Sequence, residues 1–129
     1  MADKVLLADP DVALLASYRT YLSRHGFQVT TAKDGLECVA RLRAFRPDIV
    51  VLSPRLLWGA GEGVLAMMYE EKDVPLVPVL ALDDEYREDG RYLIGPFPVR
   101  GYHVKPLAPA LLAASLAQAL QKQRASLPN

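Results

Sequence analysis

The chain has 129 residues, of which 51% are hydrophobic and 23% charged, a composition typical of one globular domain with a core of ordinary size. Its 15 basic residues balance 15 acidic ones, so no charge signature of a nucleic-acid or anionic-membrane binder is present. The single cysteine, Cys38, excludes an internal disulfide and a cysteine-rich metal site. No signal peptide follows Met1, and no apolar run approaches the roughly 20 residues that span a bilayer. We therefore expect a cytoplasmic protein.

Five short apolar segments indicate the strands of a parallel sheet. The most diagnostic is residues 49–52, four consecutive apolar residues of which three are β-branched. A strand without polar alternation is buried on both faces, as in the centre of a parallel sheet. The strands expected on this basis cover residues 4–8, 27–31, 49–52, 76–82 and 101–104.

Four segments with apolar residues at helical spacing alternate with these strands. Asp9 or Asp11 can cap the first helix, Gly26 suits its C-terminal end, Pro47 stops the second, and Pro109 begins the last. The expected helices cover residues 12–25, 34–46, 62–72 and from 109 onward.

The alternation of strand and helix predicts an α/β fold: a flavodoxin-like, doubly wound, five-stranded parallel sheet in the order 2-1-3-4-5. Residues 86–101 contain three glycines and two prolines, so the fourth helix is short or missing and ends before Ile94. We expect one domain over residues 1–124 and a polar tail over residues 125–129.

The carboxyl ends of parallel strands meet at one edge of the sheet, where function is expected. The residues that the predicted strands bring there are Asp9, Pro10, Asp11, Ser53, Asp83 and Lys105. With residues 6–11, 47–53, 60–61 and 102–106 at matching spacings, the chain resembles the receiver domain of two-component response regulators along essentially its whole length.

The resemblance implies a phosphorylation site at this edge. In that family an aspartate ending the third strand accepts a phosphoryl group from a histidine kinase, and two acidic residues after the first strand bind Mg²⁺. A Ser or Thr after the fourth strand and a Lys after the fifth contact the phosphoryl oxygens. An aromatic residue on the fifth strand, here Tyr102, reports the modification by changing rotamer.

This chain departs from the pattern at three of these positions. Ser53 replaces the phosphoacceptor, and a hydroxyl cannot form an acyl phosphate. Pro10 replaces a metal ligand, and Asp83 stands where a hydroxyl would donate to phosphate. We therefore expect weak or absent Mg²⁺ binding, no other cofactor or metal, no enzymatic activity, and a vestigial pocket closed by an ion pair of Lys105 with Asp9 or Asp83.

A protein partner is expected to bind elsewhere, at the surface formed in receivers by the fourth helix, fifth strand and fifth helix. Trp58, in a loop beside the pocket, is either a lid or an exposed contact. The candidate contact residues are Trp58, Tyr86, Tyr92, Phe97 and Tyr102. A signalling kinase, another regulator or a second copy of the chain could occupy this surface, whereas nucleic acid and membrane are not expected.

Three functions are consistent with the sequence. The first, which we favour, is an atypical receiver in bacterial two-component signalling that acts as a phosphorylation-independent interaction module. The second is a receiver that still accepts phosphate on Ser53 or a neighbouring carboxylate. The third is a flavodoxin-like domain that binds a small molecule in the vacated pocket.

Overall fold

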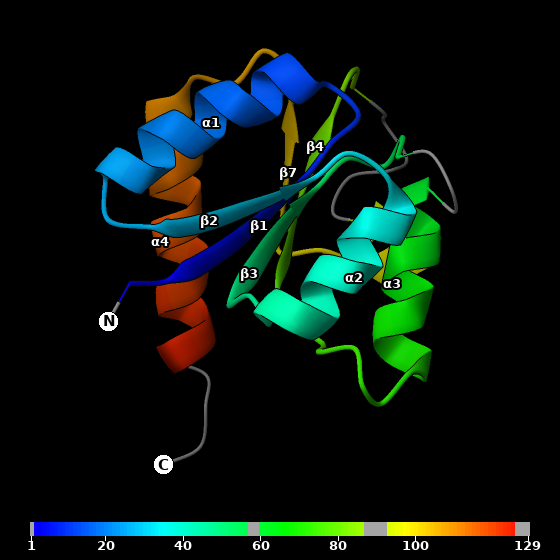
Figure 1. Cartoon of the computed structure of the whole chain (residues 1–129). Helices are drawn as coiled ribbons and strands as arrows, with labels where there is room; N and C mark the ends of the chain where they lie inside the picture. Colours follow the sequence, from blue (N-terminus) through cyan, green and yellow to red (C-terminus); the bar gives the residue numbers. More distant parts are fainter. Residues whose placement is uncertain (1, 57–59, 87–92, 126–129) are drawn as a thin grey trace.

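The computed structural model describes residues 2–56, 60–86 and 93–125. Its centre is a five-stranded parallel sheet in the order β2-β1-β3-β4-β7, which confirms the predicted topology (Figure 1). The strands are β1 (Lys4–Ala8), β2 (Gln28–Ala32), β3 (Ile49–Leu52), β4 (Val79–Asp83) and β7 (Gly101–Val104). All four residues of β3 are buried because helices cover both faces of the sheet.

Two pairs of helices enclose the sheet. Helices α1 (Val12–Arg24) and α4 (Pro109–Ala125) lie on one face, and α2 (Gly35–Phe45) and α3 (Ala60–Glu70) lie on the other (Figure 1). Each face has its own apolar cluster, with Leu22 and Leu116 in the first and Leu42 and Leu65 in the second. Helix α4 continues through Ala125, one residue beyond the expected domain boundary at 124.

Helix ends follow from the local sequence. The Asp11 side chain accepts a hydrogen bond from Leu14 N at 3.1 Å and is the N-cap of α1. Gly26, with φ +92°, turns the chain after that helix toward β2. Arg46 takes the left-handed conformation, φ 52°, directly before Pro47, which cannot continue α2.

The fourth strand begins later than expected. It starts at Val79 rather than at residue 76, so residues 76–78 precede the strand. Pro75 and Pro78 lack the N–H that a sheet ladder needs, and Leu76 is 59% exposed. At its other end the strand includes Asp83 as its last residue.

A short antiparallel hairpin occupies the region where a fourth helix was expected to be short or missing. Its strands are β5 (Leu93–Ile94) and β6 (Phe97–Pro98), joined at Gly95, which has φ +57°. The Phe97 ring stacks on Tyr69 of α3 with centroids 5.1 Å apart. Between β4 and β7, the part of the chain that the structure describes contains this hairpin and no helix.

Candidate functional site

Three polar side chains are buried at the carboxyl edge of the sheet. Asp9 follows β1, Ser53 follows β3 and Asp83 ends β4, with exposed fractions of 4%, 1% and 0%. Among the described residues these are the polar or charged side chains buried in the core. Burial of polar groups costs free energy unless they are paired, so their partners decide what this edge can do.

The Ser53 side chain is buried and is hydrogen-bonded within the turn that follows β3. Its backbone N donates to Ala8 O at 2.9 Å, in line with the β1–β3 pairing, and its Oγ accepts from Arg55 N at 3.2 Å. Within the described residues, no hydrogen bond links Ser53 to Asp9, whose Oδ1 accepts from Asp11 N at 2.9 Å. The Ser53 hydroxyl thus accepts a hydrogen bond that stabilises the turn after β3.

Lys105 pairs with two carboxylates at this edge. Its Nζ lies 2.8 Å from Asp9 Oδ2 and 2.8 Å from Asp84 Oδ1. The short distance to Asp9 places the Lys105 ammonium as the counter-ion of a carboxylate that is buried at the edge of the sheet. Burial alone would lower the pKa of Lys105, but Asp84 and Asp9 outweigh it and raise that pKa. Of the two alternatives predicted for Lys105, the ion pair with Asp9 is present, and Asp84 is an additional partner.

Asp83 is held by a residue that the sequence did not single out. Arg55 Nε lies 3.0 Å from Asp83 Oδ1, and Arg55 Nη2 lies 2.8 Å from Glu85 Oε1. The other carboxylate oxygen, Asp83 Oδ2, accepts from the Tyr102 hydroxyl at 2.8 Å. Asp83 thus joins the loop after β3 to β7, and it fixes the position of the Tyr102 side chain.

We call this set the rim network; it comprises Asp9, Arg55, Asp83, Asp84, Glu85, Tyr102 and Lys105. Within the described residues, two cations of this network face four carboxylates. Arg55 could have been suspected from the sequence, since it is the cation closest to Ser53 and the acidic run 83–85 needs a counter-charge. No spacing rule, however, gives the direction of a loop side chain.

The residues at the family's metal-ligand positions, Pro10 and Asp11, have other surroundings here. The Asp11 carboxylate caps α1, and Pro10 is exposed and has no ligating atom. Across the described part of the chain, no group of three or more His, Cys, Asp or Glu side chains is placed to hold a metal ion. The Lys105–Pro106 peptide bond is cis.

The residues proposed as a partner surface divide into three kinds. Tyr86 is 62% exposed. Phe97 and Tyr102 are partly buried, the first stacked on Tyr69 and the second bonded to Asp83. Trp58 and Tyr92 lie outside the described residues, so the choice between lid and exposed contact for Trp58 remains open.

The sheet order, the four helices and the acid-and-lysine edge together define the receiver class of α/β domains. Among solved structures, the signal receiver domain of a putative LuxO repressor protein from Vibrio parahaemolyticus superposes with a TM-score of 0.85. It is 19% identical, and the alignment covers 97% of this chain and 95% of that one.

Curated relatives agree with this class. The transcriptional regulatory protein PrrA of Mycobacterium leprae is 32% identical over 124 residues, which are 95% of this chain and 52% of that protein. A probable transcriptional regulator, ycf27 of Cyanophora paradoxa, is 29% identical over 119 residues, 92% of this chain and 48% of that protein. No family model matches. The chain has the fold of a response-regulator receiver domain and is similar in sequence to these regulators over 92–95% of its length, and it spans about half the length of the curated relatives it matches.

No helix in the described ranges is long and apolar enough to cross a membrane.

Proposed function

We propose that this receiver domain acts without aspartyl phosphorylation, as a protein-interaction module of two-component signalling whose partner is a kinase or another regulator. The observation that carries the proposal is the residue at the end of β3. It is Ser53, it is 1% exposed, and its Oγ is engaged by a backbone N–H. A carboxylate nucleophile is therefore missing from the position where the family's chemistry occurs.

The charges around Ser53 also oppose phosphoryl transfer. A phosphoryl group needs free cationic donors, yet Lys105 is already paired with Asp9 and Asp84, and Arg55 is paired with Asp83 and Glu85. An incoming anion has to break these pairs and then faces the released carboxylates. At an effective dielectric near 20, like charges about 4 Å apart repel by roughly 4 kcal/mol.

Metal binding is disfavoured for a related reason. Mg²⁺ keeps its waters unless carboxylates or phosphates draw it into an octahedral site. Here Asp9 is paired with Lys105, Asp11 is the cap of α1, and Pro10 has no ligand atom. We expect no binding of Mg²⁺ at millimolar concentration and, with no activated nucleophile, no enzymatic turnover.

The test is incubation with Mg²⁺ and acetyl phosphate, followed by intact-protein mass spectrometry. We expect an unmodified mass, while a receiver that keeps the aspartate serves as the positive control. A mass increase of one phosphoryl group in this chain would overturn the proposal. In that case the variant Ser53→Ala separates phosphorylation of the hydroxyl from phosphorylation of a neighbouring carboxylate.

Thermal denaturation with and without Mg²⁺ tests the metal part separately. A ligand present at 100 times its Kd stabilises the native state by about 2.7 kcal/mol. We expect no shift of the midpoint beyond the effect of matched ionic strength, for which NaCl is the control. A Mg²⁺-specific rise would contradict the expectation.

A further inference from the structure

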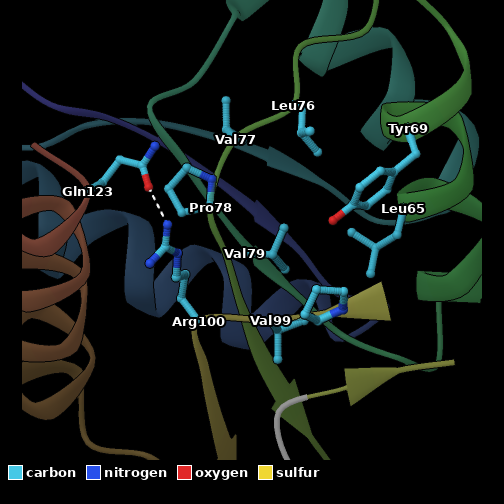
Figure 2. A pocket seen from close by; sticks show the side chains of 10 residues that line it. Leu65, Tyr69, Leu76, Val77, Pro78, Val79, Val99, Arg100 and Gln123 are labelled. Carbon is cyan, nitrogen blue, oxygen red and sulfur yellow. Dashed lines mark hydrogen bonds between the residues drawn. The ribbon is translucent and has the colours of Figure 1, made fainter. Parts of the chain in front are cut away.

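An apolar groove lies beside α3, away from the rim network. It has a volume of about 480 Å³ and runs between α3, residues 76–78, the start of β4 and the link from β6 to β7 (Figure 2). Seven of its ten lining residues are aliphatic, including Leu65, Leu76, Val79 and Val99, and Tyr69, Arg100 and Gln123 add polar groups to the lining. Two of them are large and open to solvent: Leu76 is 59% exposed and Tyr69 is 50% exposed.

Among the described residues, the helices on this face leave the start of β4 uncovered. A parallel sheet is stable when both faces are covered, commonly by helices. On the face that carries α2 and α3, the described residues beyond α3 provide only the hairpin β5–β6, which packs on Tyr69 through Phe97. The hairpin is two residues long on each side, and the start of β4 remains at the floor of the groove.

One end of the groove is cationic. Arg100 Nη2 donates to Gln123 Oε1 at 2.7 Å, as Figure 2 shows, and this amide is a neutral partner. Among the described residues, no carboxylate lies within ion-pair distance of Arg100. Arg100 also lines a neighbouring hollow of about 320 Å³ together with Lys122, which is exposed. A carboxylate arriving at this end would therefore find a cation without a counter-charge.

We propose that this groove is the docking site for an amphipathic helix of a partner protein, with an apolar face and a carboxylate beside it that pairs with Arg100. A helix fits because it extends the layer of α2 and α3, and its apolar face covers Leu76 and Tyr69. A carboxylate beside that face would be complementary to the exposed charge of Arg100. This inference rests on the proposed function and specifies the chemistry of its partner.

The probe is an Ala-based helical peptide of about 18 residues, since shorter helices are marginal in water. It carries leucines along one face and two glutamates at one flank of that face; a matched peptide carries lysines in place of the glutamates. Binding of each labelled peptide is measured by fluorescence anisotropy at low salt. We expect the acidic peptide to bind and the basic peptide to bind more weakly.

Two pairs of variants locate the binding. Leu76→Asp should weaken the acidic peptide by at least about tenfold, as loss of an anchor side chain does, whereas Leu111→Asp on α4 should not. Leu111 is the matched control because it is also 59% exposed. Arg100→Glu should invert the preference in favour of the basic peptide, whereas Arg19→Glu on α1 should leave it unchanged. Thermal denaturation verifies that every variant is folded.

Three results would overturn the proposal: no binding of either peptide at millimolar concentration, equal effects of Leu76→Asp and Leu111→Asp, or no inversion by Arg100→Glu. Analytical ultracentrifugation of the unliganded chain gives a fourth. Self-association that Leu76→Asp abolishes would assign the groove to a second copy instead. Failure of the proposed function has a different signature, because it shows as a phosphate adduct in the mass spectrum and leaves peptide binding unchanged.

Discussion

Replacing Lys105 by Met should destabilise the protein by leaving a buried carboxylate without its counter-ion. At the observed 2.8 Å separation from Asp9 Oδ2, the attraction is about 6 kcal/mol at an effective dielectric near 20 and about 1.5 kcal/mol in water. The cost of removing the two charged groups from water offsets much of this attraction. Removing one partner of a fully buried pair costs about 3–5 kcal/mol. Because the Lys105 side chain is 18% exposed, we expect about 2–3 kcal/mol.

The assay is urea denaturation at neutral pH of the wild type, Lys105→Met, Asp9→Asn and the double variant. The Asn side chain keeps an oxygen for Asp11 N, so the double variant should recover about 1–2 kcal/mol relative to the sum of the single losses. Lys33→Met is the control: Lys33 pairs with Glu37 at 3.8 Å with both side chains exposed, and its loss should cost less than about 0.5 kcal/mol. A coupling of zero, or equal effects at Lys105 and Lys33, would refute the assignment of Lys105 as the internal counter-ion.

Three further predictions concern other parts of the molecule. Burial, with a smaller contribution from Asp34, raises the pKa of Cys38 from 9.0 to about 12. The unfolded chain therefore loses the thiol proton first, and stability falls by up to about 1.4 kcal/mol per pH unit above pH 9. Cys38→Ala should make the free energy of unfolding less dependent on pH between pH 9 and about 10. An unchanged pH dependence would contradict the claim that burial raises the pKa of Cys38. Burial lowers the pKa of His103 below 6.5, so the neutral imidazole stabilises the folded state above that pH, and this stabilisation is lost as the pH falls. His103→Gln should therefore reduce the fall of the thermal midpoint on acidification. Gly95 has φ +57°, and an added Cβ would lie 2.5 Å from Glu62 Cδ, so Gly95→Ala should cost about 1–2 kcal/mol. Gly63→Ala, where nothing lies within 4 Å of the added Cβ, should be neutral or stabilising, and equal losses at the two glycines would rule out a backbone cause.

The sheet could be predicted because its strands are dictated by local patterns. The apolar run Ile49–Leu52 can only be satisfied between two covered faces, and the helices that follow each strand impose a parallel order. The prolines at 75 and 78 explain why β4 starts at Val79, a limit that the apolar pattern alone concealed. The hairpin β5–β6 was missed because strands of two residues are too short to show alternation.

Several residues of the candidate site could be predicted from the sequence, but their hydrogen bonds and ion pairs could not. Strand ends placed Asp9, Ser53, Asp83 and Lys105 at one edge, since that follows from topology. The pairing of Asp83 with Arg55 did not follow, because it depends on the path of the loop after Ser53 and on a side chain that no periodicity orients.

The bridge from Arg55 through Asp83 to Tyr102 couples the stability contributions of these three side chains. Ser53→Asp alone would add a carboxylate beside two that are already buried, and Asp83→Thr alone would leave Arg55 and Tyr102 without their shared acceptor. We therefore expect each of these single changes to lower the free energy of unfolding. The stability of this edge depends on Arg55 and Asp83 as a pair, so a change at one of the two positions is best tolerated when the other changes with it.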